Sequence, residues 1–161
     1  MRKTTCDYPW NESVKTDSLY EMICLAEKEV PDRAVFKYRQ GKDNIIEVSN
    51  KELRKSVDAM YLALDMIGAN ESHITVIGPS SYKWLLTYIS VLCSENVVVP
   101  VDKDLPDADL AYVINHSDSE YLFCATKKYE EFFKEHRDEY PNIKKFISFD
   151  KEEDEGDFLS F

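Results

Sequence analysis

The spacing of hydrophobic residues switches between a helical and a strand-like period several times between residues 17 and 149. Apolar side chains recur every three to four residues over 18–30, 49–68, 82–94, 106–116 and 127–139, which predicts five helices. Short β-branched or aromatic runs at 34–38, 45–48, 74–77, 97–101, 120–124 and 145–149 predict strands. From residue 74 onward the two kinds of element alternate, which is typical of parallel sheets joined by helical crossovers.

We therefore expect an α/β fold: a three-layer, Rossmann-like parallel sheet with helices on both faces, preceded by an N-terminal helix and a β-hairpin. Ser49 and Glu52 have the spacing of a capping box, and Gly68 is placed to end the helix that they begin. The helix over 82–94 is apolar nearly all round, so we expect it to be deeply buried. The continuous run Val97–Val101 predicts a strand covered on both faces.

The chain divides into three parts by composition. Residues 1–15 lack periodicity and are expected to form an extended arm, and residues 16–149 form one α/β subdomain. Residues 150–161 are an acidic tail, which we expect to be a solvated, mobile loop and a truncation point, natural or introduced. Recruitment of a basic partner is the alternative for this tail.

Charge and cysteine content limit the binding partners and the cellular compartment that we expect. The 161 residues include 20 Lys and Arg against 31 Asp and Glu, a net charge of −11. This balance disfavours nucleic acid and anionic membranes as partners. No signal peptide is recognisable, and no apolar run reaches the roughly 18 residues that span a bilayer, so we expect a cytoplasmic protein. Cys6, Cys24, Cys93 and Cys124 lack zinc-site spacing and are expected to be structural.

Glycine is too scarce for the common phosphate-binding loops. The four glycines, at positions 41, 68, 78 and 156, fit neither a GxxxxGK loop nor a GxGxxG turn.

The order of the segments resembles the N-terminal region of the AMP-forming acyl-CoA synthetases, an adenylate-forming family, and among them the long-chain fatty-acid CoA ligases. Four segments carry the resemblance. Val48–Leu53 resembles the family's "(T/S)YxEL" helix start, and Ser80–Trp84 its "N-S-x-E-W" segment. Val97–Asp102 resembles "VxVPLD", and Leu105–Ser117 resembles "LPxxELxYILxHS". The similarity spans about residues 17 to 150, with departures at Asn50, Ser80, Lys83 and Glu95.

The resemblance implies a ligase that activates a fatty or other carboxylic acid with ATP and passes the acyl group to CoA. It implies ATP, Mg and CoA for a full-length relative, whose phosphate loop, adenine and ribose contacts and catalytic lysine lie downstream of the part that this chain matches. We therefore expect an inactive fragment with no catalytic residue and no cofactor of its own. Its partner would be the remainder of the enzyme or another copy, and exposed apolar surface favours a homo-oligomer. The alternative is a stand-alone Rossmann-like binding or protein-interaction module without catalysis.

Ser80 and Ser81 are the candidate anion site, because they lie between a predicted strand and a helix N-terminus. A turn with a serine N-cap is the favoured alternative, because no cation accompanies the serines in the sequence pattern. Asp102 and Asp104, near Lys103 and Asp107, could bind a cation, but a solvated loop with a capping Asp is favoured.

The remaining candidate residues have structural explanations. His73, His116 and His136 share no ligand spacing, and His116 is placed to interact with a helix end. Five aromatic residues are expected in the core rather than in a base-stacking platform: Tyr82, Trp84, Tyr88, Phe132 and Phe133.

Overall fold

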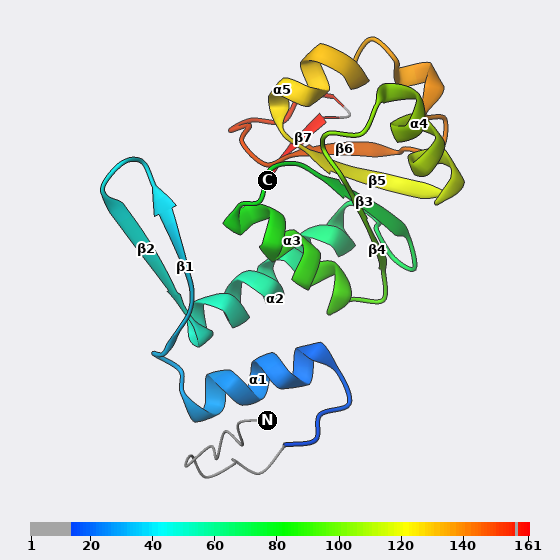
Figure 1. The fold of residues 1–161 in the computed structure, drawn as a ribbon. Helices are drawn as coiled ribbons and strands as arrows, with labels where there is room; N and C mark the ends of the chain where they lie inside the picture. The colour runs from blue at the N-terminus through cyan, green and yellow to red at the C-terminus, as the bar shows by residue number, and fades with distance from the viewer. Residues whose placement is uncertain (1–13, 157) are drawn as a thin grey trace, which may run out of the picture.

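The structure is a computed structural model that describes residues 14–156 and 158–161 (Figure 1). The predicted arm over residues 1–15 falls almost wholly outside the described residues, and so does Cys6.

The helices are α1 (Leu19–Glu29), α2 (Asn50–Met66), α3 (Tyr82–Leu92), α4 (Asp107–His116) and α5 (Thr126–Lys128). A hairpin is formed by β1 (Ala34–Gln40) and β2 (Asn44–Ser49). The remaining strands are β3 (His73–Ile77), β4 (Val97–Val101), β5 (Ser119–Cys124), β6 (Lys145–Ser148) and β7 (Phe158–Ser160). No helix among the described residues is long and apolar enough to cross a membrane.

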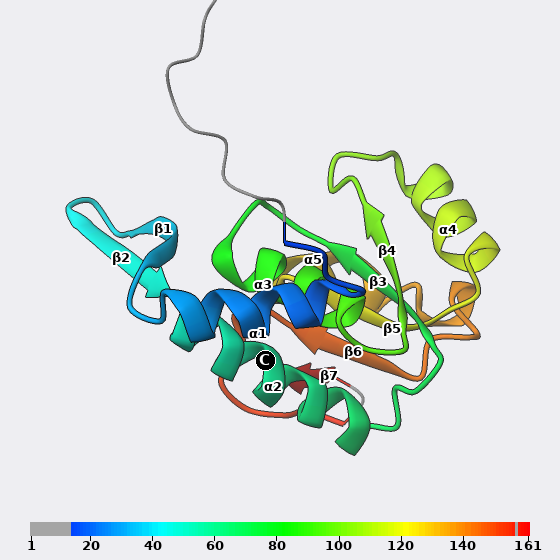
Figure 2. The same cartoon turned by 90° about the horizontal axis from the view of Figure 1, so that it is seen from below.

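The central sheet is parallel, with the strand order β4-β3-β5-β6-β7. Helices α2 and α3 cover one face, and α4 and α5 lie on the other (Figures 1 and 2). The predicted α/β fold, with its N-terminal helix and hairpin, is confirmed.

Two hydrophobic cores, one on each face, hold the sheet between its helices. Alternation along β5 assigns its side chains to the two sides: Leu122 and Cys124 join the core under α4, whereas Tyr121 and Phe123 join the core under α2 and α3. Leu122 is completely buried. Strands covered in this way read as continuous apolar runs in a sequence, which explains why β3 and β5 were predictable.

Local capping signals act as the sequence predicts. The Ser49 hydroxyl accepts a hydrogen bond from the Glu52 amide, and the Glu52 carboxylate accepts one from the Ser49 amide, so the capping box of α2 is complete. Gly68 follows α2 with a φ of +79°, a left-handed conformation that favours glycine after a helix.

Two predictions about burial were wrong. β4 is an edge strand, and Val97 is 49% exposed, because no further strand pairs with its outer side among the described residues. The predicted deeply buried helix α3 buries only one side, and Leu92 at its end is 45% exposed.

The predicted helix over 127–139 is also wrong in form. The chain there is divided into the short α5, a π-helical turn over Tyr129–Phe133 and a 3-10 turn over Arg137–Glu139. The π-turn accompanies the burial of two consecutive aromatic rings, Phe132 and Phe133, in the core under α4.

The end of the acidic tail is ordered, in contrast to the predicted solvated loop. Residues 158–160 form β7, which pairs in parallel with β6. The Phe158 ring is only 1% exposed and stacks on Tyr129 with 3.8 Å between ring centroids. Burial of this one aromatic side chain explains why an otherwise acidic segment returns to the sheet.

Candidate functional site

A cavity of about 680 Å³ lies outside the carboxyl ends of the parallel strands. Its walls come from Pro79 and Ser80 after β3, Ala125 after β5, and Phe149 and Asp150 after β6. The chain passes from β3 to β4 on one side and then places β5 on the other side of β3, so the strand order reverses here. Such a switch point is where open α/β sheets bind their ligands.

The hairpin and the last residue close the cavity. Tyr38, Arg39 and Gln40 of β1 border it, as does Phe161. Tyr38 stacks on Tyr82 of α3 with 5.1 Å between ring centroids and nearly parallel planes. Burial is the main cause of the raised pKa of Tyr82, although a hydrogen bond with Ser56 acts in the opposite direction. Tyr82 is therefore neutral at physiological pH, and it forms an aromatic wall with Tyr38.

The candidate anion residues Ser80 and Ser81 both border this cavity. The Ser81 hydroxyl accepts a hydrogen bond of 3.1 Å from the Trp84 amide, and Ser81 is the N-cap of α3. Ser80 is exposed beside it. Ser81 is thus a helix N-cap, as the alternative to an anion site predicted. Ser80 does not cap the helix and borders the cavity.

Two cations that the sequence pattern did not connect with the serines border the same cavity. Lys83 donates a hydrogen bond of 2.7 Å from Nζ to the Phe149 carbonyl, and its Nζ lies 4.9 Å from the Phe161 ring centroid. Arg39 lies on the hairpin side. Neither cation forms an ion pair within residues 14–156 and 158–161. Arg39 lies far away in sequence, so only tertiary structure brings it to the serines.

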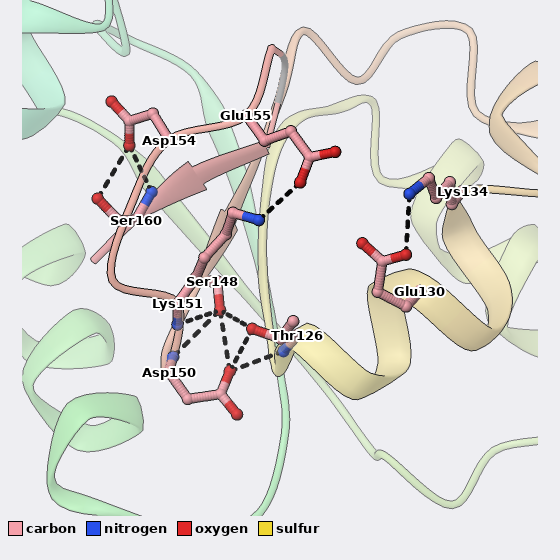
Figure 3. Close-up of polar contacts among 9 residues, drawn as sticks. All are labelled: Thr126, Glu130, Lys134, Ser148, Asp150, Lys151, Asp154, Glu155 and Ser160. Carbon is pink, nitrogen blue, oxygen red and sulfur yellow. Dashed lines mark hydrogen bonds and ion pairs between the residues drawn. The ribbon is translucent and has the colours of Figure 1, made fainter.

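Asp150 fixes the strand ends that form the floor of the cavity (Figure 3). Its Oδ1 accepts hydrogen bonds from the Thr126 amide at 2.7 Å, the Thr126 hydroxyl at 2.8 Å and the Ser148 hydroxyl at 2.9 Å. Burial is the largest single influence and raises the pKa of Asp150, but these hydrogen bonds together lower the pKa below its ordinary value. Asp150 is therefore an anchored carboxylate that joins the ends of β5 and β6.

The same figure shows how the acidic segment is fixed above this floor. Asp154 Oδ1 accepts hydrogen bonds from the Ser160 amide and hydroxyl, and Lys151 pairs with Glu155 at 2.8 Å (Figure 3). These contacts bring Phe161 to the cavity rather than leaving it in solvent.

The glycine beside this edge packs against an aromatic ring. Gly78 precedes Pro79 of the cavity wall, and a Cβ placed on it would lie 3.1 Å from the Phe149 ring. The absent side chain thus makes room for an aromatic ring, whereas phosphate loops use glycine to bring backbone amides to the ligand. Pro79, which follows, has no amide hydrogen to offer.

The other candidate residues lie apart from one another. Asp102 Oδ1 accepts the Asp104 amide at 3.0 Å, and Lys103 pairs with Asp104 at 2.6 Å, as in a self-contained polar loop. The expected capping Asp is wrong, because the N-cap of α4 is Pro106 without a side-chain hydrogen bond. No cluster of three or more potential metal ligands occurs in the described part of the chain.

The histidines, cysteines and aromatic residues are dispersed as well. His116 stacks on Tyr112, and His136 pairs with Glu139 at 2.8 Å. The three described cysteines are free thiols. Phe132 and Phe133 are core residues as predicted, whereas Tyr82, Trp84 and Tyr88 are only partly buried. The correction follows from the one-sided burial of α3.

The chain matches a known protein family. The AMP-binding enzyme family matches residues 26–159, which is most of the chain. This chain belongs to the AMP-binding enzyme family. The match extends into β7, a strand that the acidic composition of the tail did not predict. No curated protein matches the chain significantly.

Solved structures of family members share the fold at low sequence identity. A protein described as a long-chain-fatty-acid CoA ligase from Rhodopseudomonas palustris superposes with a TM-score of 0.76 at 14% identity, over 92% of this chain and 36% of that one. Coronafacic acid ligase from Pectobacterium brasiliense superposes with a TM-score of 0.75 at 14% identity, and the alignment covers 89% of this chain and 28% of that one. Anthranilate CoA ligase in complex with anthranoyl-AMP superposes with a TM-score of 0.68 at 15% identity, and the alignment covers 86% of this chain and 26% of that one. The chain thus spans about a third or less of these structures.

The cavity supplies groups that can bind and orient a small molecule. Serine hydroxyls, the Lys83 ammonium, the Arg39 guanidinium, the Asp150 carboxylate and aromatic rings all border it.

Proposed function

We propose that this chain is the N-terminal part of an adenylate-forming acyl ligase that activates a fatty or other carboxylic acid with ATP and transfers it to CoA. The family match over residues 26–159 carries the proposal. The chain alone is proposed to be inactive, and ATP, Mg and CoA to be used only by the complete enzyme. The proposed setting is the cytoplasm.

Two measurements test this proposal. Pyrophosphate exchange with ATP, run beside an active acyl-CoA ligase, should show no turnover by this chain with fatty or aromatic acids. Isothermal titration should show no tight ATP binding, because the phosphate loop and the adenine and ribose contacts implied by the family resemblance lie downstream of the part that this chain matches. Turnover or tight ATP binding would contradict the proposed inactivity. The reading frame after Phe161 tests the ligase assignment itself, since it should encode a Ser/Thr/Gly-rich loop.

A binding module without catalysis is the second candidate. It is favoured by one observation, the large cavity at the carboxyl ends of the parallel strands. A reading frame that ends without adenylation motifs, together with ligand binding by this chain, would decide for this candidate.

We also propose that the chain self-associates. Leu92 and Val97, which are 45% and 49% exposed, lie at the end of α3 and the start of the edge strand β4. Exposed apolar side chains beside an unpaired strand edge favour association between copies. Light scattering should detect a dimer or a larger assembly, and a monomer at high concentration would contradict it.

A further inference from the structure

The cavity at the strand ends has the dimensions and walls of a small-molecule site. Its volume of about 680 Å³ falls within the roughly 300–1,000 Å³ of typical ligand pockets. Four aromatic rings line it, and they belong to Tyr38, Tyr82, Phe149 and Phe161. They come from four separate places along the chain, so the fold gathers them here.

The four rings are arranged in two pairs along the cavity. Tyr38 and Tyr82 stack on each other, and Phe149 and Phe161 lie 6.2 Å apart in a tilted arrangement. Aromatic walls of this kind favour a planar apolar body, because ring contacts add to the gain from burial.

The charge of the cavity differs from that of the rest of the chain. The whole sequence carries −11, yet Lys83 and Arg39 border the cavity against one carboxylate, Asp150. Asp150 already accepts three hydrogen bonds on Oδ1 from Thr126 and Ser148. The cavity therefore has an excess of positive charge.

Lys83 has hydrogen-bonding capacity left for a ligand. An ammonium has three N–H donors, and one of them is used by the Phe149 carbonyl at 2.7 Å. No carboxylate pairs with Lys83 among the described residues. The neighbouring Ser80 hydroxyl is exposed at the same cavity.

We propose that this cavity binds a small organic anion with a planar apolar body, whose anionic group contacts Lys83 and whose ring lies against the aromatic wall. The site is independent of adenylation, since it needs neither ATP nor a catalytic group. A carboxylate and a phosphate ester share this chemistry.

Titration of the chain followed by amide NMR tests the proposal. Benzoate and phenyl phosphate are the two probes, benzyl alcohol is the neutral control, and inorganic phosphate is the control without a ring. At least one aromatic anion should shift the amide signals of Ser80–Lys83 and Phe149, and should bind about tenfold more tightly than both controls. The stronger of the two probes identifies the anionic group. Equal binding of benzyl alcohol or of inorganic phosphate would overturn the proposal, and so would the absence of shifts at the cavity.

Variants then assign the anion contact. Lys83→Gln should weaken binding of the aromatic anion about tenfold and leave benzyl alcohol unaffected, whereas Lys83→Arg should retain binding. Lys42→Gln removes the same charge from the hairpin turn, away from the cavity lining, and should change nothing. Anion binding that survives Lys83→Gln unchanged would overturn the assignment.

A second variant covers the case in which Lys83→Gln disturbs folding. Ser80→Trp places a large ring at an exposed position of the cavity wall and should block both aromatic anions. Thermal unfolding of this variant should match the wild-type chain. Retained anion binding in a folded Ser80→Trp protein would overturn the proposal.

Discussion

The two sheets of this protein differ in how much of each strand is covered. In the parallel sheet, Ile74 of β3 and Leu122 of β5 are fully buried because helices cover both faces. In the hairpin, Val35 and Ile45 are 42% and 60% exposed. Only one hairpin face meets the body, through residues such as Phe36 and Tyr38 that pack near α3.

The difference explains where the cavity forms. The strand ends of the covered sheet provide the floor, and the hairpin provides a wall that packs on α3 through the Tyr38–Tyr82 stack among other contacts. Elements with few buried apolar contacts open more readily than core strands. The floor of the cavity therefore belongs to the covered sheet, whereas one wall belongs to a hairpin with one exposed face.

The largest expected effect is a loss of stability on truncation of a buried side chain in the parallel sheet, compared with an exposed one in the hairpin. Leu122→Ala should lower the free energy of unfolding by about 2–5 kcal/mol, because it leaves a void in the completely buried core under α4. Val35→Ala in the hairpin should cost about 0.5 kcal/mol or less. Urea unfolding of both variants provides the measurement. Similar losses of unfolding free energy for Leu122→Ala and Val35→Ala would contradict the difference in burial between the two sheets.

Phe158→Ala tests whether β7 belongs to the covered sheet. We expect a loss of about 3 kcal/mol, since the buried ring stacks on Tyr129. Val97→Ala on the opposite edge strand is the control and should cost about 0.5 kcal/mol, because Val97 is half exposed. If chemical unfolding shows no change for Phe158→Ala, the acidic tail is the solvated loop that its composition suggests.

Two adjacent serines at the start of α3, between the hairpin and the parallel sheet, should differ in their effect on stability. Ser81→Ala should destabilise the chain by about 1 kcal/mol, because it removes the side-chain acceptor of the Trp84 amide. Ser80→Ala should be close to neutral, as Ser80 is exposed and forms no cap. Thermal denaturation compares the pair, and equal effects would argue against the capping role.

The smallest predicted effect concerns the anchored strand ends. The folded-state pKa of Asp150 lies below its ordinary value of 3.8, so its stabilising contribution is present above about pH 4. It is lost as the pH falls through the lower folded-state pKa. Asp150→Asn should therefore be less stable at neutral pH and flatten the fall in melting temperature at acidic pH.

Asp43→Asn in the exposed hairpin turn is the matched control for Asp150→Asn, and it should follow the wild-type pH profile. Parallel profiles for the Asp150 variant and the wild-type chain below pH 4 would count against the anchoring role.

Much of the fold was determined by the sequence alone. Local signals are sufficient where they act over a few residues, as in the capping box of Ser49 and Glu52 and at Gly68. The period of apolar residues identified β3 and β5 because strands covered on both faces must be apolar throughout. The segment order also pointed to the adenylate-forming family, which the match over residues 26–159 confirms.

Other features were decided by tertiary structure. Val97–Val101 reads as a central strand, but its place at the edge depends on which strands remain to pair with it. β7 was missed because one buried ring, Phe158, outweighs the acidic residues before it. The cavity was missed for a similar reason: Arg39, Lys83 and Phe161 share a site only after the sheet and hairpin are assembled. Sequence spacing specifies contacts within an element, whereas contacts between distant elements exist only in the folded chain.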